Sequence, residues 1–328
     1  MRRLAVTGTV VILVLAMSPL ASATIHGRNG RIAFRQYLNS AQTHGAIFTI
    51  EPDGTGLRQV THPRKGVITK EPDWSPNGRW IVYHRQEGEG TPQIFKIRPN
   101  GSHKVNLSKT SCTKGCLGES DPAWSPYGKR IAFQRDSCST GSNNLLTVYV
   151  MRADGSHVRR VTQTNATCAS SHRFESQSPQ CAPSGNRLVF ERIDTKREMH
   201  ALFTTRLDGT GLRRLTPWHM DAAQPDWSPQ GRWIVFRTQE QSETQGNIAL
   251  VHPNGTGRHL ITHGGSTHKW LSCTFSPNGK RITAARAPGF GSASNADVYT
   301  MNKDGSQRQN VTHSNAWESA PDWGSRRS

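Results

Sequence analysis

Short apolar segments alternate with polar, turn-forming segments along the whole chain. Five apolar segments, rich in β-branched and aromatic side chains, occupy residues 80–83, 130–133, 187–190, 233–236 and 281–284. They are too short for helices, so the pattern predicts β-strands. Their repeat of about 50 residues predicts an array of one supersecondary unit.

A polar phrase precedes each of these apolar segments. It reads Pro-Asp-Trp-Ser-Pro-Asn-Gly-Arg at residues 72–79 and is nearly the same at residues 225–232. Degenerate copies occupy residues 122–129, 179–186 and 273–280, and a truncated copy occupies residues 321–324. The Ser-Pro-Asn-Gly portion suits a type I turn between two strands, with proline at its second position and glycine at its fourth.

A third strand and a hairpin follow in each repeat. Segments such as residues 93–97 and 146–150 have the composition of strands and precede an Asp-Gly or Asn-Gly pair. Such pairs tolerate the positive φ that tight hairpins need. They occur at residues 53–54, 100–101, 154–155, 208–209, 254–255 and 304–305. A fourth strand, often ending in Val-Thr or Leu-Thr, completes the unit, and the repeated unit predicts an all-β, six-bladed β-propeller with four-stranded blades.

The two ends of the chain supply complementary parts of one blade. Residues 30–34 have second-strand sequence with no Pro-Asp-Trp phrase before them, whereas residues 321–324 are a first strand without a successor. We expect a ring closed by the C-terminal strand, which completes the N-terminal blade and removes exposed sheet edges. An open array with a frayed last repeat is the alternative.

The polar phrase, the Ile-Ala-Phe-like second strand and the Asp-Gly and Leu-Thr endings resemble the repeat of the TolB-like six-bladed β-propeller family. The resemblance covers residues 30–324 and implies the fold more strongly than the function. In TolB an N-terminal α/β domain precedes the ring and helps to couple it to the Tol–Pal envelope system. Here we expect the propeller repeats without that domain. The resemblance also implies that four repeat tryptophans wedge between blades as structural residues: Trp74, Trp124, Trp227 and Trp323.

Residues 1–23 have the features of a signal peptide. Two arginines precede a mostly apolar stretch, and residues 21–23 form a small-residue cleavage site. A retained membrane anchor is the alternative, although no later segment is apolar for long enough to span a bilayer. We expect residues 24–328 to form one exported propeller domain, secreted or periplasmic.

Six cysteines in an exported chain favour disulfides over metal or redox sites. Four of them fall in long loops between predicted strands, and our hypothesis pairs Cys112 with Cys116 and Cys138 with Cys168. The other two fall in predicted inner strands. There they are either small buried side chains or a bridge near the ring axis.

The formal net charge of the chain is +18. A basic exported protein can bind an anionic surface polymer, lipid headgroups or an acidic partner. Because the charges are spread over every repeat without a basic run, we do not expect nucleic acid binding. A generally solvated basic surface is the alternative to a binding patch. We expect a monomer that does not span a membrane.

Two faces of a propeller can be distinguished from the order of its strands. The Ser-Pro-x-Gly and Asp/Asn-Gly turns share one face, here called the turn face. The longer connections share the other, here called the loop face, where function usually concentrates. We expect five carboxylates and one tryptophan near the inner strands to form a ligand-binding site at the channel mouth on the loop face: Glu71, Glu119, Glu175, Asp221, Glu318 and Trp270.

Such a carboxylate ring could hold Ca²⁺, which prefers hard oxygen ligands, or the Lys and Arg side chains of a partner. The alternative is a set of solvated carboxylates that never converge. Histidines also fall on this face, at His172, His219 and His268. A transition-metal site would need three or four converging imidazoles. Histidines at equivalent repeat positions, His62, His263 and His313, lie on a wide circle, too far apart to share one ion, so a repeated loop role is favoured and the metal stays unknown.

The sequence contains no Gly-x-Ser-x-Gly, His-Glu-x-x-His or phosphate-binding Gly-rich motif, so we assign no catalytic residue. Our hypothesis is a non-catalytic exported scaffold that recognises a protein or peptide of the cell envelope or extracellular medium on its loop face. The alternative is a secreted polymer-acting lyase or hydrolase with a site at the channel mouth.

Overall fold

Short β-strands and one 3-10 helix, η1 (Trp218–Met220), make up the described part of the chain. The computed structural model describes residues 27–108, 116–137, 145–164, 170, 172–239, 246–263, 268–288 and 295–326. The predicted signal peptide therefore lies outside the described residues, as do Cys112, Cys138 and Cys168. No helix within the described ranges has the length and apolar character needed to cross a membrane.

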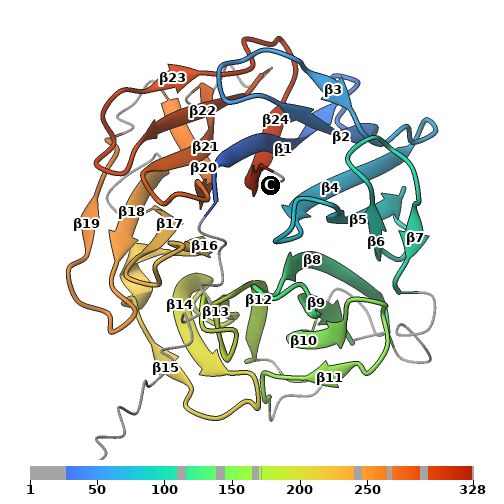
Figure 1. Cartoon of the computed structure of the whole chain (residues 1–328). Coiled ribbons are helices and arrows are strands. Elements are labelled where there is room, and N and C mark those ends of the chain that lie inside the picture. The colour runs from blue at the N-terminus through green and yellow to red at the C-terminus, as the bar shows by residue number, and fades with distance from the viewer. Residues whose placement is uncertain are drawn as a thin grey trace, which may run out of the picture.

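The described strands form six four-stranded antiparallel blades arranged in a ring (Figure 1), and a single parallel pairing of Gly45 with Ile68 joins blades 1 and 2 into one sheet. Blades are numbered in chain order and each is written from its innermost strand outwards. Blade 1 contains β24 (Glu318–Ser325), β1 (Asn29–Tyr37), β2 (Gly45–Ile50) and β3 (Arg58–Gln59); blade 2 contains β4 (Val67–Trp74), β5 (Ile81–Glu87), β6 (Gln93–Ile97) and β7 (Val105–Asn106); blade 3 contains β8 (Gly118–Trp124), β9 (Arg130–Asp136), β10 (Leu146–Arg152) and β11 (Arg159–Arg160).

The second half of the chain repeats this arrangement. Blade 4 contains β12 (Phe174–Cys181), β13 (Arg187–Asp194), β14 (Met199–Arg206) and β15 (Arg213–Arg214); blade 5 contains β16 (Ala223–Trp227), β17 (Ile234–Thr238), β18 (Asn247–Val251) and β19 (His259–Leu260); blade 6 contains β20 (His268–Phe275), β21 (Arg281–Pro288), β22 (Asp297–Asn302) and β23 (Gln309–Asn310). The expected all-β propeller is therefore confirmed.

The last strand of the chain pairs with the first. β24 runs antiparallel to β1, with Trp323 opposite Ile32 and Glu318 opposite Gln36. It also packs against β20 of blade 6 and β4 of blade 2. The expectation that a C-terminal strand completes the N-terminal blade is confirmed by this pairing.

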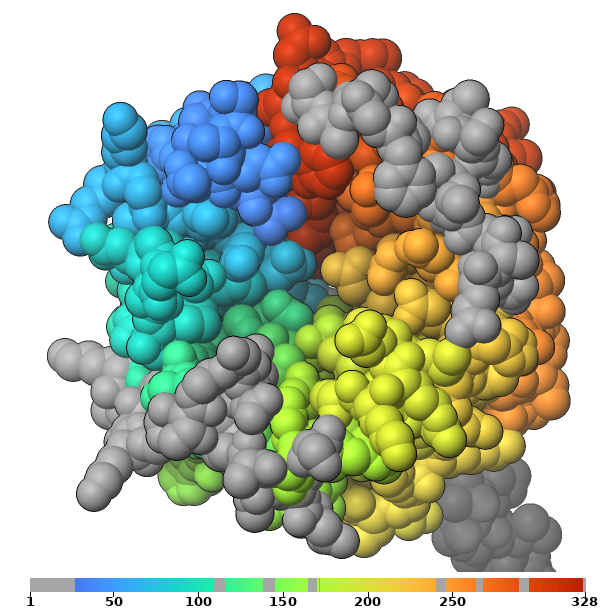
Figure 2. All heavy atoms as spheres, turned by 180° about the vertical axis from the view of Figure 1, so that it is seen from behind, coloured from blue at the N-terminus to red at the C-terminus, as the bar shows by residue number. Residues whose placement is uncertain are grey.

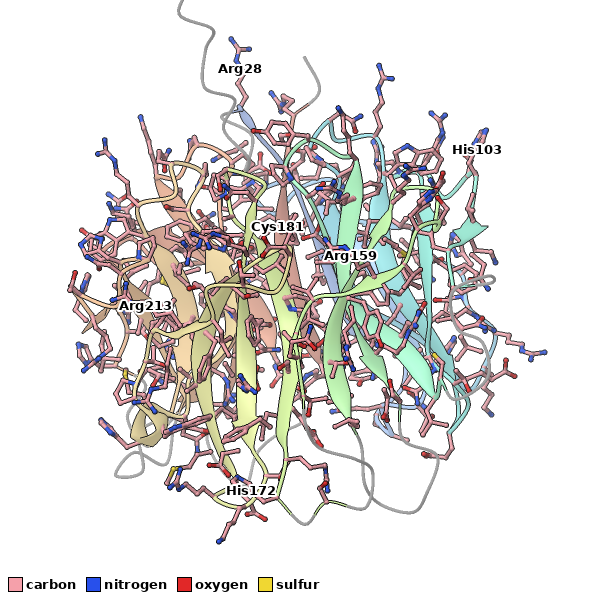
Figure 3. All side chains as sticks on the ribbon, turned by 90° about the horizontal axis from the view of Figure 1, so that it is seen from below. Arg28, His103, Arg159, His172, Cys181 and Arg213 are labelled. Atoms are coloured by element: carbon pink, nitrogen blue, oxygen red, sulfur yellow. The ribbon has the colours of Figure 1, made fainter. Side chains whose placement is uncertain are left out.

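The two kinds of turn lie at the same end of the blades. In the Ser-Pro-Asn-Gly turn of blade 2, the Gly78 N–H donates to the Ser75 carbonyl, and the Ser75 hydroxyl accepts the Trp80 N–H at 2.8 Å. The glycines of the six Asp/Asn-Gly hairpins have φ between 81° and 90°, as predicted for these turns. In Figure 3, His103, which follows one hairpin, marks the turn face at the top, and His172, which precedes β12, marks the loop face at the bottom.

The fourth strands are shorter than the sequence predicts. Each is only two residues long and ends before the Val-Thr, Leu-Thr or equivalent pair. At that pair a side-chain hydroxyl replaces the missing ladder acceptor: the Thr61 hydroxyl accepts the Ile47 N–H at 2.8 Å, and the Thr216 hydroxyl accepts the Leu202 N–H at 2.9 Å. The recurring threonine therefore holds the outer edge of a blade to its third strand.

The repeat tryptophans pack between neighbouring blades, as predicted. Trp227 contacts a cluster that joins Leu202 of blade 4 to Phe236 of blade 5 and is 4% exposed. Trp124 is buried between blades 2 and 3, Trp323 between blades 6 and 1, and Trp74 is partly buried between blades 1 and 2. Since an indole buries a large apolar area, these side chains stabilise the contacts between blades.

Cysteine takes part in the same packing. Cys181 occupies the tryptophan position between blades 3 and 4, and Cys273 is buried in β20. Both are free thiols, so the bridge near the axis is ruled out. Burial raises the pKa of Cys181 to about 12, which keeps its thiol protonated. Cys116 is disulfide-bonded, but its predicted pairing with Cys112 stays a prediction because Cys112 lies outside the described residues.

Candidate functional site at the central channel

Each inner strand carries a bulge in the same place. The pairing register between the first and second strands shifts there in every blade. In five blades the residue directly before the repeat proline has a positive φ: Glu71 (51°), Asp121 (47°), Ser178 (47°), Gln224 (50°) and Ala320 (51°). A bulge changes the direction of the side chains around it. These five residues, with Ser272 of β20, line a central cavity of about 70 Å³.

Figure 2 shows this channel as a hollow between the blades on the side opposite to Figure 1. The cavity is lined by the middle of the inner strands, which run from the loop face towards the turn face. A second cavity of about 70 Å³ continues it towards the turn face. Pockets for small molecules usually measure roughly 300–1,000 Å³, so each half of the channel is narrow.

Four of the six residues expected at the channel mouth are packed inside the protein. Glu119, Glu175, Glu318 and Trp270 are buried, with exposed fractions of 0%, 7%, 1% and 0%, and none of them lines the central cavity. The bulge is the reason. The left-handed residue directly before the proline lines the cavity, whereas Glu119 and Glu318, three positions before the proline, are packed within the blades.

The two other predicted residues are more accessible. Glu71 lines the central cavity. Asp221 ends η1 in a left-handed conformation with φ 46° and accepts a hydrogen bond from the His200 N–H at 3.2 Å. Of the six predicted ligand-binding residues, the structure therefore places only Glu71 in the channel wall.

The buried carboxylates join neighbouring blades. Glu119 of blade 3 pairs with Arg135 and accepts a hydrogen bond from Ser108, which in turn supports the third strand of blade 2. Burial raises the pKa of Glu318 in blade 1 to about 7, although hydrogen bonds from Thr312 and Ser314 of blade 6 favour its charged form. These contacts give Glu119 and Glu318 structural roles.

Charged side chains of blades 1 to 3 meet in the loop-face half of the channel. Burial, and after it the negative charge of Glu71, raises the pKa of Asp121 to about 7. The Arg35 guanidinium is 3.8 Å from the Glu71 carboxylate. Burial, together with the positive charges of Lys70 and Arg35, holds the pKa of His84 well below its usual range. His84, whose Nδ1 is 3.9 Å from Asp121, is therefore neutral and does not compensate the acidic pair.

Three aspartates of the repeat phrase connect blades around the axis. The Asp322 carboxylate accepts the Trp74 N–H at 2.6 Å, Asp73 accepts the Trp124 N–H at 2.8 Å, and Asp226 accepts the Phe275 N–H at 2.7 Å. Each bond links one blade to the next blade in the chain. Burial is the main cause that raises the pKa of Asp322 to about 6 and that of Asp226 to about 8.

The predicted histidines do not converge. His172 pairs with Asp194 at 2.9 Å near the edge of blade 4, His219 is exposed in η1, and His268 begins β20. Within the described ranges, no group of three or more His, Cys, Asp or Glu side chains could hold a metal ion. The Ca²⁺ expectation thus gains no support from these residues and stays untested.

The bulge also brings residues to the channel that the sequence analysis missed. Asp121, Ser178 and Gln224 line the cavity beside Glu71, and Ser178 donates its hydroxyl to Asp121 at 3.2 Å. The sequence contained a sign of these positions, because a proline within a strand marks an edge strand or a bulge. The residue directly before each repeat proline was therefore the better candidate.

Residues 110–327 match the family described as the TolB beta propeller domain, which is about two thirds of the chain. The chain belongs to this family. Its repeat tryptophans at 124, 227 and 323 lie in the matched region and occupy equivalent places between blades. The family resemblance seen in the repeat phrase is thus confirmed.

Two curated relatives match parts of this TolB-family propeller. "Uncharacterized peptidase YuxL" of Bacillus subtilis strain 168 is 24% identical over 220 residues, which cover 56% of this chain and 28% of that protein. "Tol-Pal system protein TolB 1" of Novosphingobium aromaticivorans is 36% identical over 81 residues, covering 24% of this chain and 16% of that protein. The chain thus spans less than a third of the length of either relative.

TolB from Acinetobacter baumannii is a similar solved structure. It superposes with a TM-score of 0.69 at 20% sequence identity and covers 90% of this chain and 67% of that chain. At this identity the likeness shows the fold alone. The activity and the partners of the relatives therefore do not follow for this chain from structural similarity.

Proposed function

We propose that this protein is an extracytoplasmic binding module that recognises a basic segment of a protein or peptide at the loop-face end of its channel. The observation that carries the proposal is the acidic pair Glu71 and Asp121. These side chains come from adjacent blades, line the same cavity and repel each other.

The surroundings of this pair are suited to a cation from outside. Of the two carboxylates, Arg35 forms an ion pair with Glu71. The positive charge of Lys70 lowers the pKa of Asp121 but does not outweigh burial and the charge of Glu71. His84 is neutral and adds no positive charge. A Lys or Arg side chain placed between the two carboxylates would relieve their repulsion and form charge-assisted hydrogen bonds. This is the partner chemistry expected for a carboxylate ring, carried here by the predicted Glu71 and by Asp121, which was not predicted.

The size of the cavity supports binding rather than turnover. One water molecule needs roughly 10–15 Å³ of such space, so about 70 Å³ admits a few waters or the end of one side chain. A peptide docked across the loop face could insert a single basic side chain. A polymer chain or a folded substrate would remain outside the channel.

The relatives support an envelope setting without deciding it. One is named a Tol-Pal system protein, and the predicted signal peptide also favours export. The other is named a peptidase, which keeps the hydrolase alternative testable. We therefore take a protein or peptide of the cell envelope or extracellular medium as the partner.

Capture from extracts tests this proposal. Residues 24–328 are immobilised and exposed to envelope and culture-medium extracts of the source organism, beside the double variant Glu71→Gln/Asp121→Asn. We expect a partner held by the unaltered ring and lost by the variant, because neutral amides lack the negative charge that attracts a basic side chain and strengthens its hydrogen bonds. The matched control Asp53→Asn/Asp208→Asn changes two exposed turn-face carboxylates and should retain the partner.

Two outcomes would count against loop-face recognition. A partner retained equally by all three proteins would move the interface away from Glu71 and Asp121. Turnover of a peptide or polymer by the unaltered ring, abolished in the Glu71→Gln/Asp121→Asn variant, would replace the binding module with an enzyme.

A further inference from the structure

One cross-strand position at the turn face can be compared between blades 1 to 5. It pairs the start of the second strand with the end of the third. Blade 1 places Arg31 against Glu51 in an ion pair at 2.8 Å. Blade 2 places Arg98 over the Trp80 ring at 5.1 Å, and blade 5 stacks Trp233 on His252 at 3.8 Å. In these blades the two side chains complement each other.

Blades 3 and 4 place arginine opposite arginine at the same position. Arg130 of β9 pairs with Arg152 of β10, and Arg187 of β13 pairs with Arg206 of β14. Like charges directly opposite each other in a sheet are destabilising. In blade 4, Arg187 donates to the Thr204 hydroxyl and Arg206 to the Thr210 hydroxyl, each at 3.3 Å.

The arginine pair of blade 3 borders a pocket of about 520 Å³ on the turn face. Lys96 of blade 2 and Lys129 add two further positive charges to the lining, and Asp154 is its one carboxylate. No described carboxylate lies within ion-pair distance of Arg130 or Arg152. The half-exposed ring of Tyr127 forms part of the rim. The pocket therefore carries a large excess of positive charge.

A neighbouring pocket has the same number of cationic and acidic side chains, but its acid is ion-paired with the arginines. It measures about 370 Å³ between blades 1 and 2 and is lined by Arg31, Arg58, Arg98 and Arg326 together with Glu51. There Glu51 pairs with Arg31 at 2.8 Å and with Arg326 at 4.0 Å. Glu51 is thus ion-paired with its arginines, whereas Asp154 of the blade 3 pocket lies beyond ion-pair distance of Arg130 and Arg152.

We propose that the blade 3 pocket binds a phosphate group carried by a sugar-sized molecule, with Arg130 and Arg152 as its main ligands. Two guanidinium forks on adjacent strands can each donate two parallel hydrogen bonds to a tetrahedral oxyanion. Four cations against one carboxylate favour a dianion over a singly charged carboxylate. The volume leaves room for one sugar ring beside the phosphate, and an aromatic rim can pack against such a ring.

This inference concerns the turn face and does not depend on the recognition proposed for the loop face. The phosphate could belong to a free sugar phosphate or to a phosphate-bearing surface polymer, which share the same chemistry at the pocket. Glucose 1-phosphate and polyphosphate serve as probes for these two sources. Sodium chloride at matched ionic strength controls for general screening of the basic surface.

Isothermal titration calorimetry tests the proposal on residues 24–328. We expect saturable binding of at least one probe, weakened roughly tenfold or more by Arg130→Gln/Arg152→Gln, since each lost charge-assisted hydrogen bond costs about that factor. The matched control Arg187→Gln/Arg206→Gln removes the equivalent pair of blade 4 and should change affinity less than about twofold.

The unliganded Arg130→Gln/Arg152→Gln variant should melt at or above the temperature of the unaltered protein, because a like-charge pair is removed. A folded variant makes the binding result decisive. Binding of glucose 1-phosphate would identify a free ligand, and binding of polyphosphate alone would identify a polymer. The proposal is overturned if neither probe binds saturably or if both double variants lose affinity equally.

Discussion

Trp323→Ala is expected to lower the free energy of unfolding by about 3–5 kcal/mol, the cost typical of removing a buried aromatic side chain. Trp323 is 4% exposed and packs with Phe34 of blade 1 and Val298 of blade 6. Its indole N–H donates to the Gly30 carbonyl at 3.0 Å. The substitution removes this bond and leaves a cavity where the two ends of the chain meet.

Urea denaturation measures this loss, and hydrogen exchange locates it. Amides of β24 and β1 should exchange faster in the variant than those of blades 3 and 4, because the damage is local to the junction. Trp317→Ala is a suitable control, since the Trp317 side chain is partly exposed beside Lys269 and does not belong to the buried apolar cluster that contains Trp323. A loss below about 1 kcal/mol for Trp323→Ala would contradict the structural role of the repeat tryptophans.

Raising the pH from about 5 to 8 is expected to lower the stability of the ring. Burial raises the pKa of Asp322 to about 6 and that of Asp226 to about 8, from an ordinary value of 3.8. Within this window the folded state holds protons that the unfolded chain has lost. The free energy of unfolding therefore falls with rising pH, by at most about 1.4 kcal/mol per pH unit for each carboxyl. The fall ends above the pKa of the folded state.

Asp226→Asn isolates one of these groups. The amide oxygen of Asn can still accept the Phe275 N–H that Asp226 accepts at 2.7 Å, but it does not ionise. Chemical denaturation at a series of pH values should give a shallower decline between about pH 6 and 8 for the variant than for the unaltered protein. Asp208→Asn is the control, because this exposed turn carboxylate has a pKa lowered by its hydrogen bond to Thr210. Identical slopes for Asp226→Asn and the unaltered protein would refute the effect.

The fold could be predicted from the sequence because each repeat contains two recognisable turn-forming motifs. The Ser-Pro-Asn-Gly and Asp-Gly segments leave few other conformations, and the truncated phrase at the C-terminus matched the strand missing from the first blade. The tryptophan positions followed from the same repeat. The length of the fourth strands did not, since a threonine hydroxyl such as that of Thr61 replaces a backbone acceptor there.

The residues that line the channel were harder to predict, because the bulge in each inner strand determines which side chains face the cavity. Glu71, Glu119 and Glu318 were all expected near the mouth because they precede inner strands on the loop face. The structure places Glu71 and Asp121, each directly before a repeat proline, in the cavity wall and buries Glu119 and Glu318 in the blades. Backbone conformations of this kind depend on the neighbouring strand and are weakly marked in sequence. The proline after each bulge was the available sign.

Selection of displayed peptides on the immobilised ring tests the central claim most directly. A random peptide library is selected on residues 24–328, and the affinities of enriched peptides are measured for the unaltered protein and for Glu71→Gln/Asp121→Asn. The account predicts peptides that share a Lys or Arg and that bind the variant roughly tenfold or more weakly. Enriched peptides that lack a basic residue, or that bind both proteins equally, would contradict it.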